Sequence, residues 1–351
     1  MRKGILLVNL GTPNSPSVRD VRKFLAEFLM DERVIDIHPF FRFLLVWGII
    51  IPFRGPASAR LYRQIWDAQT GSPLLHYSNL QQQLLKLEMG EDHVIELGMR
   101  YQYPSIELAL NKLKAAGADS IQVIPLFPQY ASATTGSVIA EVMRVISRWH
   151  FIPPVSMSGA FYNHRLFVEA FALNAAKYGV NSFDHVLFSF HGLPERQLKA
   201  CKSPGSQSHQ CENCTIEITA QNKNCYAAQC HETARLLARE INISIPDYTV
   251  CFQSRLGKQE WVKPYTSLTI RKLAAFGKKR LLVICPAFVS DCLETIHEIA
   301  SEYRDEFIAA GGENLQLVES LNGSPTFIAL LKSIASQNAS DLIGQSCLDI
   351  I

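Results

Sequence analysis

Short apolar segments recur along the chain and alternate with longer segments of mixed polarity. The apolar runs are rich in Val, Ile and Leu, lack the strict alternation of half-exposed strands, and occupy residues 4–10, 94–97, 121–127, 186–190, 249–252 and 281–284. Runs of this kind are typical of parallel strands covered by helices on both faces. The pattern therefore predicts an α/β fold built on buried parallel strands.

The intervening segments have the periodicity of amphipathic helices. Examples are residues 105–116, 166–178, 233–241, 266–276 and 293–309. Strands that alternate with helices of this length favour an open α/β sheet with right-handed crossovers. The first apolar run follows two cations, but it is short, contains an Asn and lacks a small-residue cleavage site, so we interpret it as a strand and not as a signal peptide.

The chain of 351 residues is too long for one ordinary core, and a prior of roughly 150 residues per domain predicts two domains. We expect an N-terminal domain over 1–152 and a C-terminal domain over 153–323, with a helix at about 324–338 that packs back on the first. Segments 112–128 and 271–289 share the order helix, Gly turn, strand and proline-containing exit. This similarity reflects either a duplication or the general form of helix–turn–strand units.

The composition narrows the range of partners. Hydrophobic residues make up 48% of the chain, which is enough to build a large core. The net charge of +2 arises from scattered cations and anions without a Lys/Arg run, so nucleic acid is not an expected partner. The apolar run 43–51 has nine residues, against the roughly 20 that a spanning helix needs, so we expect it to touch a membrane and not to cross one.

Candidate chemistry lies where the strands end, because ligands of open α/β sheets bind beyond the carboxyl ends of the strands. His191 follows the run 186–190 in the segment LFSFHGLP, where Gly192 and Pro194 turn the chain away. A histidine so placed is a candidate base or metal ligand. Taken alone, it would more often be a strand-end histidine that bonds a carbonyl group.

A second group of residues favours a functional role for His191. Glu294, Glu298 and Glu302 follow one another at intervals of four residues, shortly after Asp291, and would share one helical face. On a surface helix they would be a solvated stripe. Because like charges at this spacing repel one another, a path for metal ions or protons is a better interpretation of these carboxylates than a structural role. With His191, the carboxylates predict a cleft that handles metal ions.

Seven segments together resemble the successive motifs of the ferrochelatases. They are NLGTP, GSPL, GMRYQYP, PLFPQYASATTGS, SFHGLPER, FQSRLG and PAFVSDCLET, and they follow in the family's order over residues 3–333. The resemblance implies two Rossmann-like (chelatase-type) α/β domains, with parallel sheets flanked by helices and a porphyrin cleft between them. It implies a lyase that inserts Fe²⁺ into a porphyrin, either protoporphyrin IX or coproporphyrin III, with release of two protons.

The resemblance also implies roles for individual residues. The family's metal-site histidine and glutamate fall on His191 and Glu294, where we expect catalysis and contact with the Fe²⁺ substrate. The expected proton or metal path comprises Glu298, Glu302 and Asp291, and the expected porphyrin contacts are Ser72, Arg100 and Tyr130, of which Arg100 would pair with a propionate. Cys292 departs from those relatives that carry histidine there.

A hydrophobic lip is expected over residues 40–51. It would grip the ring and rest on a bilayer, which implies a cytoplasmic enzyme held peripherally at the inner face of the membrane. By pattern alone, a buried core helix is an equal alternative.

A cysteine-rich insertion is expected over 200–226, in a segment poor in apolar residues. It contains Cys201, Cys211, Cys214 and Cys225, which favour a metal staple. The [2Fe–2S] arrangement common in the family is absent, because its internal cysteine position is Ser132 here and the tail has only Cys347. Certain bacterial relatives hold a cluster on such an insertion, so a [2Fe–2S] cluster is favoured over structural zinc, with Cys230 as the reserve ligand.

Two other functions remain as alternatives. One is a porphyrin carrier with the same cleft and no turnover. The other is a chelatase for another pair of substrates, such as cobalt and a sirohydrochlorin-type ring, which the lip and the FQSRLG and SDCLET segments disfavour. No motif predicts an oligomeric state.

Overall fold

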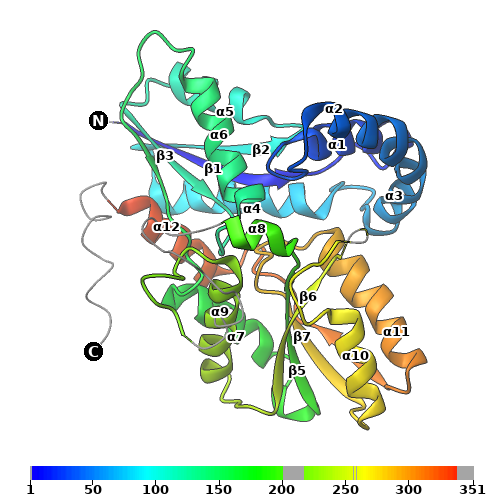
Figure 1. Ribbon diagram of the computed structural model, residues 1–351. Helices are drawn as coiled ribbons and strands as arrows, with labels where there is room; N and C mark the ends of the chain where they lie inside the picture. The colour runs from blue at the N-terminus through cyan, green and yellow to red at the C-terminus, as the bar shows by residue number, and fades with distance from the viewer. Residues whose placement is uncertain (1, 201–216, 256, 258, 338–351) are drawn as a thin grey trace.

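The computed structural model describes residues 2–200, 217–255, 257 and 259–337. Two α/β halves lie one above the other, and each is built on a four-stranded parallel sheet (Figure 1). The first sheet has the order β2-β1-β3-β4 and the second has the order β6-β5-β7-β8. The α/β class and the parallel sheets predicted from the apolar runs are thus confirmed.

The strands of the first sheet are β1 (Lys3–Gly11), β2 (His93–Tyr101), β3 (Ser120–Pro125) and β4 (Val155–Met157). Those of the second are β5 (His185–His191), β6 (Tyr248–Gln253), β7 (Arg280–Ile284) and β8 (Asn314–Leu317). The two sheets have the same topology in chain order. A helix precedes the third strand of each, and these are the two segments whose sequences resemble one another, which favours a duplication.

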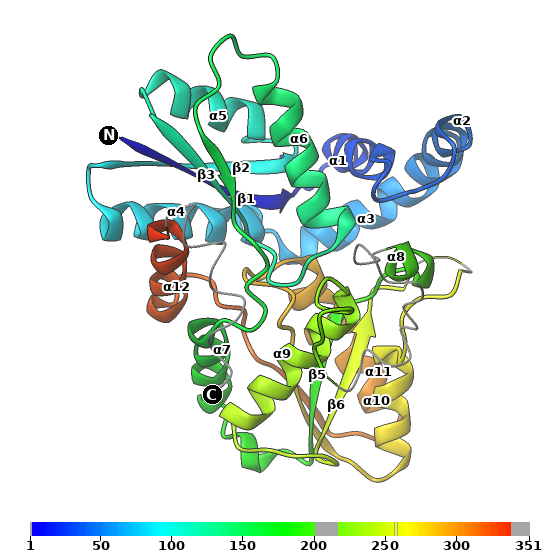
Figure 2. The ribbon, with the colours of Figure 1, turned by 60° about the vertical axis from the view of Figure 1, so that its left-hand side comes forward.

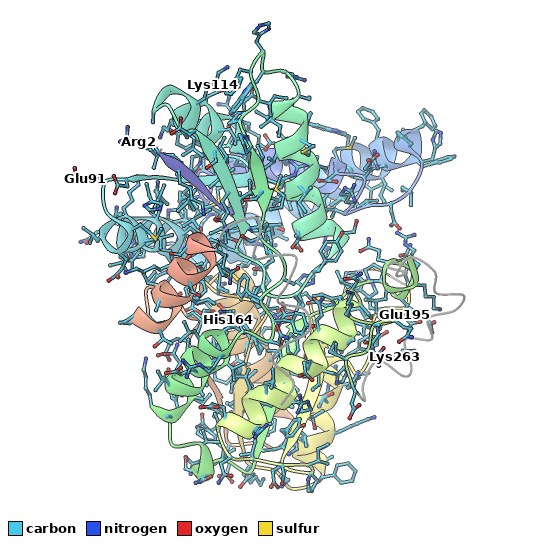
Figure 3. The ribbon with its side chains drawn as sticks, turned by 90° about the vertical axis from the view of Figure 1, so that its left-hand side faces the viewer. Arg2, Glu91, Lys114, His164, Glu195 and Lys263 are labelled. Atoms are coloured by element: carbon cyan, nitrogen blue, oxygen red, sulfur yellow. The ribbon has the colours of Figure 1, made fainter. Side chains whose placement is uncertain are left out.

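Helices cover both faces of both sheets. Those of the first half are α1 (Val18–Met30), α4 (Pro73–Met89), α5 (Ile106–Ala115) and α6 (Ser137–Ile146). Those that follow are α7 (Arg165–Ala176), α8 (Glu195–Ala200), α9 (Tyr226–Glu240), α10 (Thr266–Ala275), α11 (Arg304–Ala309) and α12 (Pro325–Ser336). His164, which caps α7, lies at the level where the two halves meet (Figure 3).

Alternate residues of the central strands enter different cores. Leu6 and Val8 of β1 pack against α5 and α6, while Leu187 of β5 packs against α10 and α11. Their neighbours Ile5, Leu7, Val186 and Phe188 belong to one cluster that also contains side chains of α4, α7, α9 and α12. One hydrophobic core therefore runs from the first sheet to the second.

The C-terminal helix α12 packs against α4 of the first half and α7 of the second. The amide of Gln122, in β3, donates to the carbonyl of Ile334 in α12 at 2.8 Å. The first sheet extends to Met157, because β4 pairs with β3, so the boundary expected after residue 152 precedes its last strand.

The lip is one continuous helix. It comprises α2 (Pro39–Phe43), a π-helical segment η1 (Leu44–Ile50) and α3 (Ile51–Ile65). The helix of 27 residues extends beyond the expected lip residues 40–51, and we use the name lip for all of it. It is long and apolar enough, by length and composition alone, to cross a membrane, so the expectation that this stretch is too short to do so is wrong. Only 22% of its most apolar stretch of 18 residues is buried. Large exposed side chains lie along it, namely Phe40, Phe41, Phe43, Leu44, Trp47, Ile49 and Phe53. The alternative of a buried core helix is thus wrong.

Four further elements differ from the sequence-based expectations. β4 and β8 were not predicted, because strands of three and four residues carry too short a pattern. Helix α9 begins at Tyr226, seven residues before the expected start. The helix expected over 293–309 begins as a π-helical segment, η5 (Glu294–Tyr303), before it becomes α11.

Candidate active site

A cleft of about 760 Å³ lies between the two halves, lined mainly by apolar side chains. The first half contributes Leu10 at the end of β1 together with residues of the lip, and the second contributes the ends of β5 and β7. The lip helix and α8 lie at the same edge of the molecule in Figure 2. Arg196 of α8 forms an ion pair with Asp36, which precedes the lip. The cleft thus lies at the strand ends, where the fold class led us to expect the site.

His191 is the last residue of β5, and its ring lines the cleft. The ring nitrogen Nδ1 lies 2.6 Å from the carbonyl oxygen of Gly192. Because a carbonyl oxygen only accepts, Nδ1 carries the hydrogen in the neutral ring and Nε2 keeps its lone pair. Trp261 and Phe288 lie against the imidazole, with ring centroids 6.4 and 6.3 Å away. His191 therefore presents a basic nitrogen in a largely apolar setting.

Glu294 begins η5 and lines the same cleft. Its main-chain carbonyl accepts a hydrogen bond of 2.9 Å from the side chain of Gln253, which ties η5 to the end of β6. The buried phenol of Tyr62 lies close enough to sense this carboxylate. Burial raises the pKa of Tyr62 well above its usual value, and the negative charge of Glu294 adds to the shift. Tyr62 was not found from the sequence, because it follows an ordinary helical pattern.

Glu298, four residues after Glu294, is partly buried and is held by four hydrogen bonds. Its carboxylate accepts from the main chain of Ser254 at 2.7 Å, from the hydroxyl of Ser254 at 2.5 Å, from Gln253 at 3.1 Å and from Tyr303 at 2.8 Å. Glu302, one turn further, is exposed. Partial burial raises the pKa of Glu302, and the nearby Glu298 carboxylate raises it further. The three glutamates thus extend from the cleft to the surface.

Asp291 does not line the cleft within the described part of the chain. Its carboxylate accepts hydrogen bonds from the hydroxyl of Thr295 at 3.0 Å, the main chain of Ser320 at 3.2 Å and the amide of Asn322 at 2.7 Å. These bonds join the start of η5 to the loop after β8. Asp291 thus has the contacts of a residue that anchors this loop.

The three expected porphyrin contacts are also absent from the cleft lining among the described residues. Ser72 is buried and shares a hydrogen bond of 2.8 Å with Thr12. Arg100 forms an ion pair of 2.7 Å with Asp31. Tyr130 lines a neighbouring pocket of about 830 Å³.

Other residues stand in the cleft instead. Arg54 of α3 lines it and, within the described ranges, forms no ion pair. Trp261 also lines it, and its buried indole nitrogen has no hydrogen-bond partner in the part of the chain that the structure describes. The hydroxyl of Tyr226, another lining residue, donates to the carbonyl of His191 at 2.8 Å. Arg54 and Tyr226 had no motif to mark them, whereas Trp261 follows the FQSRLG segment.

π-Helical geometry is concentrated around the cleft. Within the described chain, the π-helical segments are η1, η2 (Ser132–Gly136) and η5. Each contributes to the lining, with Leu45 from η1, Thr134 from η2 and Glu294 from η5. Such segments are rare and occur frequently at functional sites.

The cysteine prediction lies mostly outside the described residues, since Cys201, Cys211 and Cys214 all do. Cys225 is buried at the N-cap of α9. Burial raises the pKa of the Cys230 thiol well above its usual value, in contact with Tyr226. Among the described residues, no group of three or more His, Cys, Asp or Glu side chains has an arrangement suited to a metal ion.

The architecture resembles that of solved chelatases. SirB from Bacillus subtilis with Fe³⁺ matches with a TM-score of 0.54 and 14% identity, and the match covers 98% of each chain. The sirohydrochlorin chelatase SirB from Bacillus subtilis subspecies spizizenii, in complex with cobalt, matches with a TM-score of 0.50 at 14% identity, over 98% of each chain. At these identities the likeness shows the fold.

Sequence relatives identify the family. The family model described as Ferrochelatase matches residues 2–339. A ferrochelatase of Legionella pneumophila is 41% identical over 96% of this chain and 99% of its own length. One of Coxiella burnetii is 40% identical over 95% of this chain and 93% of its own length. The chain belongs to the ferrochelatase family, whose members are lyases that insert ferrous iron into a porphyrin in haem synthesis.

Proposed function

We propose that the cleft holds a porphyrin against its apolar walls while His191 acts on the pyrrole nitrogens at the centre of the ring. The observation that carries this proposal is the contact of 2.6 Å between Nδ1 of His191 and the carbonyl oxygen of Gly192, which leaves Nε2 as the ring nitrogen available to a substrate in a cleft that Glu294 also lines. Insertion of Fe²⁺ requires two N–H protons to leave. A neutral imidazole can accept one of them or bind the incoming ion briefly.

Glu294, Glu298 and Glu302 form the proposed route between the cleft and water. A pyrrole proton would pass from His191 or Glu294 toward the surface, where the exposed Glu302 releases it. The raised pKa of Glu302 makes this carboxyl a better proton acceptor near neutral pH than an isolated one. The same carboxylates would attract Fe²⁺. Iron would then enter along the path by which the protons leave, so that the positive charge brought in by the ion is offset by the protons released. Asp291 supports this path by holding the start of η5.

Arg54 takes the role of propionate partner that was first expected of Arg100. The guanidinium of Arg100 is already neutralised by Asp31, whereas Arg54 faces the cleft. A guanidinium binds a carboxylate through two parallel hydrogen bonds. Ser72 acts from behind the lining, because it caps α4 two residues before Leu74, which is a lining residue. Tyr130 acts from the neighbouring pocket.

A [2Fe–2S] cluster on Cys201, Cys211, Cys214 and Cys225 is the second part of the proposal. Cys225 suits a ligand because it caps α9 next to the insertion. Cys230 suits it less, since it lies further along α9 and burial raises the pKa of its thiol well above its usual value. The cluster would supply an iron–sulfur centre and tie the insertion to α9, and structural zinc is the competing assignment.

Membrane contact through the lip is the third part. The exposed side chains of the lip include five aromatic ones, namely Phe40, Phe41, Phe43, Trp47 and Phe53. Residues 37–66 contain no acidic residue and four arginines, which favours a surface with negative lipid headgroups. We infer a cytoplasmic protein that binds peripherally at the inner face of the membrane and takes up a poorly soluble porphyrin there.

His191→Ala should lower turnover by about 100-fold or more, the usual contribution of a positioned base. The reaction is followed as zinc insertion into a porphyrin by fluorescence. Porphyrin affinity, measured by quenching of protein fluorescence, should change little. The control is His150→Ala, which removes an exposed imidazole outside the cleft. Near-normal turnover of His191→Ala would remove this residue from the mechanism, and porphyrin binding without turnover by the wild-type protein would indicate a carrier.

Glu294→Gln should lower kcat far more than it weakens porphyrin binding, since the carboxylate acts in a step and not in holding the ring. Glu302→Gln should have a smaller effect, because water can replace an exposed carboxylate. Steady-state kinetics with varied porphyrin and metal separate the two constants, with Glu313→Gln as the exposed control. A change confined to porphyrin affinity would assign Glu294 to binding.

Replacement of any one of the four proposed cysteine ligands with Ser should bleach the visible charge-transfer bands of protein purified without oxygen. Cys230→Ser should keep them. Iron, sulfide and zinc contents are measured on the same samples. If colourless, active wild-type protein contained stoichiometric zinc, the cysteine ligands would be assigned correctly, but the bound metal would be zinc and not an iron–sulfur cluster. Loss of colour in Cys230→Ser with retention in Cys225→Ser would make Cys230 the fourth ligand.

The double variant Trp47→Ser/Phe53→Ser should release the protein from vesicles of phosphatidylcholine and phosphatidylglycerol. Removal of two partly exposed aromatic rings takes away apolar contact with the lipid, so the bound fraction in co-sedimentation should fall several-fold. The matched control is Leu87→Ser/Phe276→Ser, which removes two side chains exposed at 81% and 83% elsewhere on the surface. Equal binding by all three proteins would exclude the lip as the contact.

A further inference from the structure

The main chain of His191 is held differently on its two sides. On one side β5 pairs with β6, and the N–H of Gly192 donates to the carbonyl of Gln253 at 2.9 Å. Successive residues of a strand direct their main-chain groups to opposite sides, so the carbonyl of His191 points toward the β7 side. There the register of β5 with β7 ends at Phe188 and Ile284, three residues earlier. A strand partner for the His191 carbonyl is therefore missing.

Tyr226 supplies that partner. Its hydroxyl donates to the carbonyl of His191 at 2.8 Å, and its side chain is 5% exposed and lines the cleft. This hydrogen bond holds the main chain of His191, whose side chain is proposed to act on the porphyrin.

The helix that carries Tyr226 is fixed to the opposite wall of the cleft. The side chain of Gln229, one turn along α9, accepts from the main chain of Tyr130 at 2.7 Å and donates to the carbonyl of Lys223 at 2.7 Å. One turn further, the hydroxyl of Thr233 accepts from Gln129 at 3.1 Å. Gln229 and Thr233 are both buried. Helix α9 thus connects His191 with the β3 exit loop of the first half.

We propose that Tyr226 is a positioning residue, which sets where His191 stands relative to the porphyrin. This inference rests on the role proposed above for His191. The hydroxyl of Tyr226 holds the main chain of His191 from α9, and Gln229 and Thr233 in turn fix α9 against the first half.

Tyr226→Phe removes the hydroxyl and keeps the ring. We expect kcat to fall about tenfold at nearly unchanged KM for porphyrin, since a misplacement of about 1 Å costs up to roughly 100-fold. The ¹⁵N resonances of the His191 ring and the limb of the pH–rate profile that reports it should shift together. Tyr248→Phe is the matched control, because Tyr248 pairs with Val186 near the other end of β5 and packs edge-to-face against Phe188. Unchanged kcat and unchanged His191 resonances in Tyr226→Phe would overturn the proposal.

A second variant protects this test against simple unfolding. 4-Aminophenylalanine at position 226 retains a donor at the same place, so it should restore most of kcat; restoration of stability without kcat would overturn the positioning role. Near-normal turnover of His191→Ala would refute the role proposed for His191, whereas the His191 resonances in Tyr226→Phe would still decide whether Tyr226 positions this residue.

Discussion

One hydrophobic cluster that contains a face of each sheet holds the two halves at a fixed distance. Ile5 and Leu7 of β1 enter it from the first half, and Phe188 and Phe190 of β5 enter it from the second. Such cores are close-packed, so the halves cannot slide past each other without opening cavities. Because the strands of both sheets are anchored in this cluster, their carboxyl ends lie at set positions on either side of the cleft. The chemistry of the site depends on that rigidity.

Next to this core, each half holds a carboxylate by hydrogen bonds at the end of its second strand. Asp31 accepts hydrogen bonds from Arg100 and Tyr101 beside β2, and Glu298 accepts from Gln253 and Ser254 beside β6. The first is compensated by a guanidinium, which gives a closed ion pair at the base of the lip. The second is held by uncharged donors only, so its negative charge is not neutralised by a cation in this hydrogen-bonded group. This difference favours the second half as the location of the proposed acidic path.

Much of the fold could be predicted, because buried parallel strands leave a strong pattern. The runs that became β1, β3, β5, β6 and β7 are all nearly fully buried. The strand-end rule also located His191 in the cleft. What could not be predicted is which polar residues near a strand end face the cavity. Arg100 and Asp291 occupy motifs next to the site, yet each satisfies a buried partner, and this depends on contacts between residues about 70 and 30 positions apart. Tyr226 was hidden for the same reason, since its role lies in one long-range hydrogen bond.

The two halves use equivalent positions for different purposes. Leu7 pairs with Leu97 and Ile124 in the first sheet, and Phe188 pairs with Val250 and Ile284 in the second. Counting three residues onward in each strand gives Leu10 and His191, and both line the cleft. Each is followed by a glycine at a point of close approach, since a Cβ on Gly11 would lie 2.0 Å from the carbonyl of Tyr101 and one on Gly192 would lie 2.8 Å from that of Gln253.

The close approach of the backbone at the strand end is therefore shared by the two halves, while the side chain before the glycine differs. An apolar residue on one wall and an imidazole on the other suit a flat apolar ring whose reactive nitrogens need a base from one direction only. Divergence of two similar halves accounts for this asymmetry more simply than independent construction of each wall.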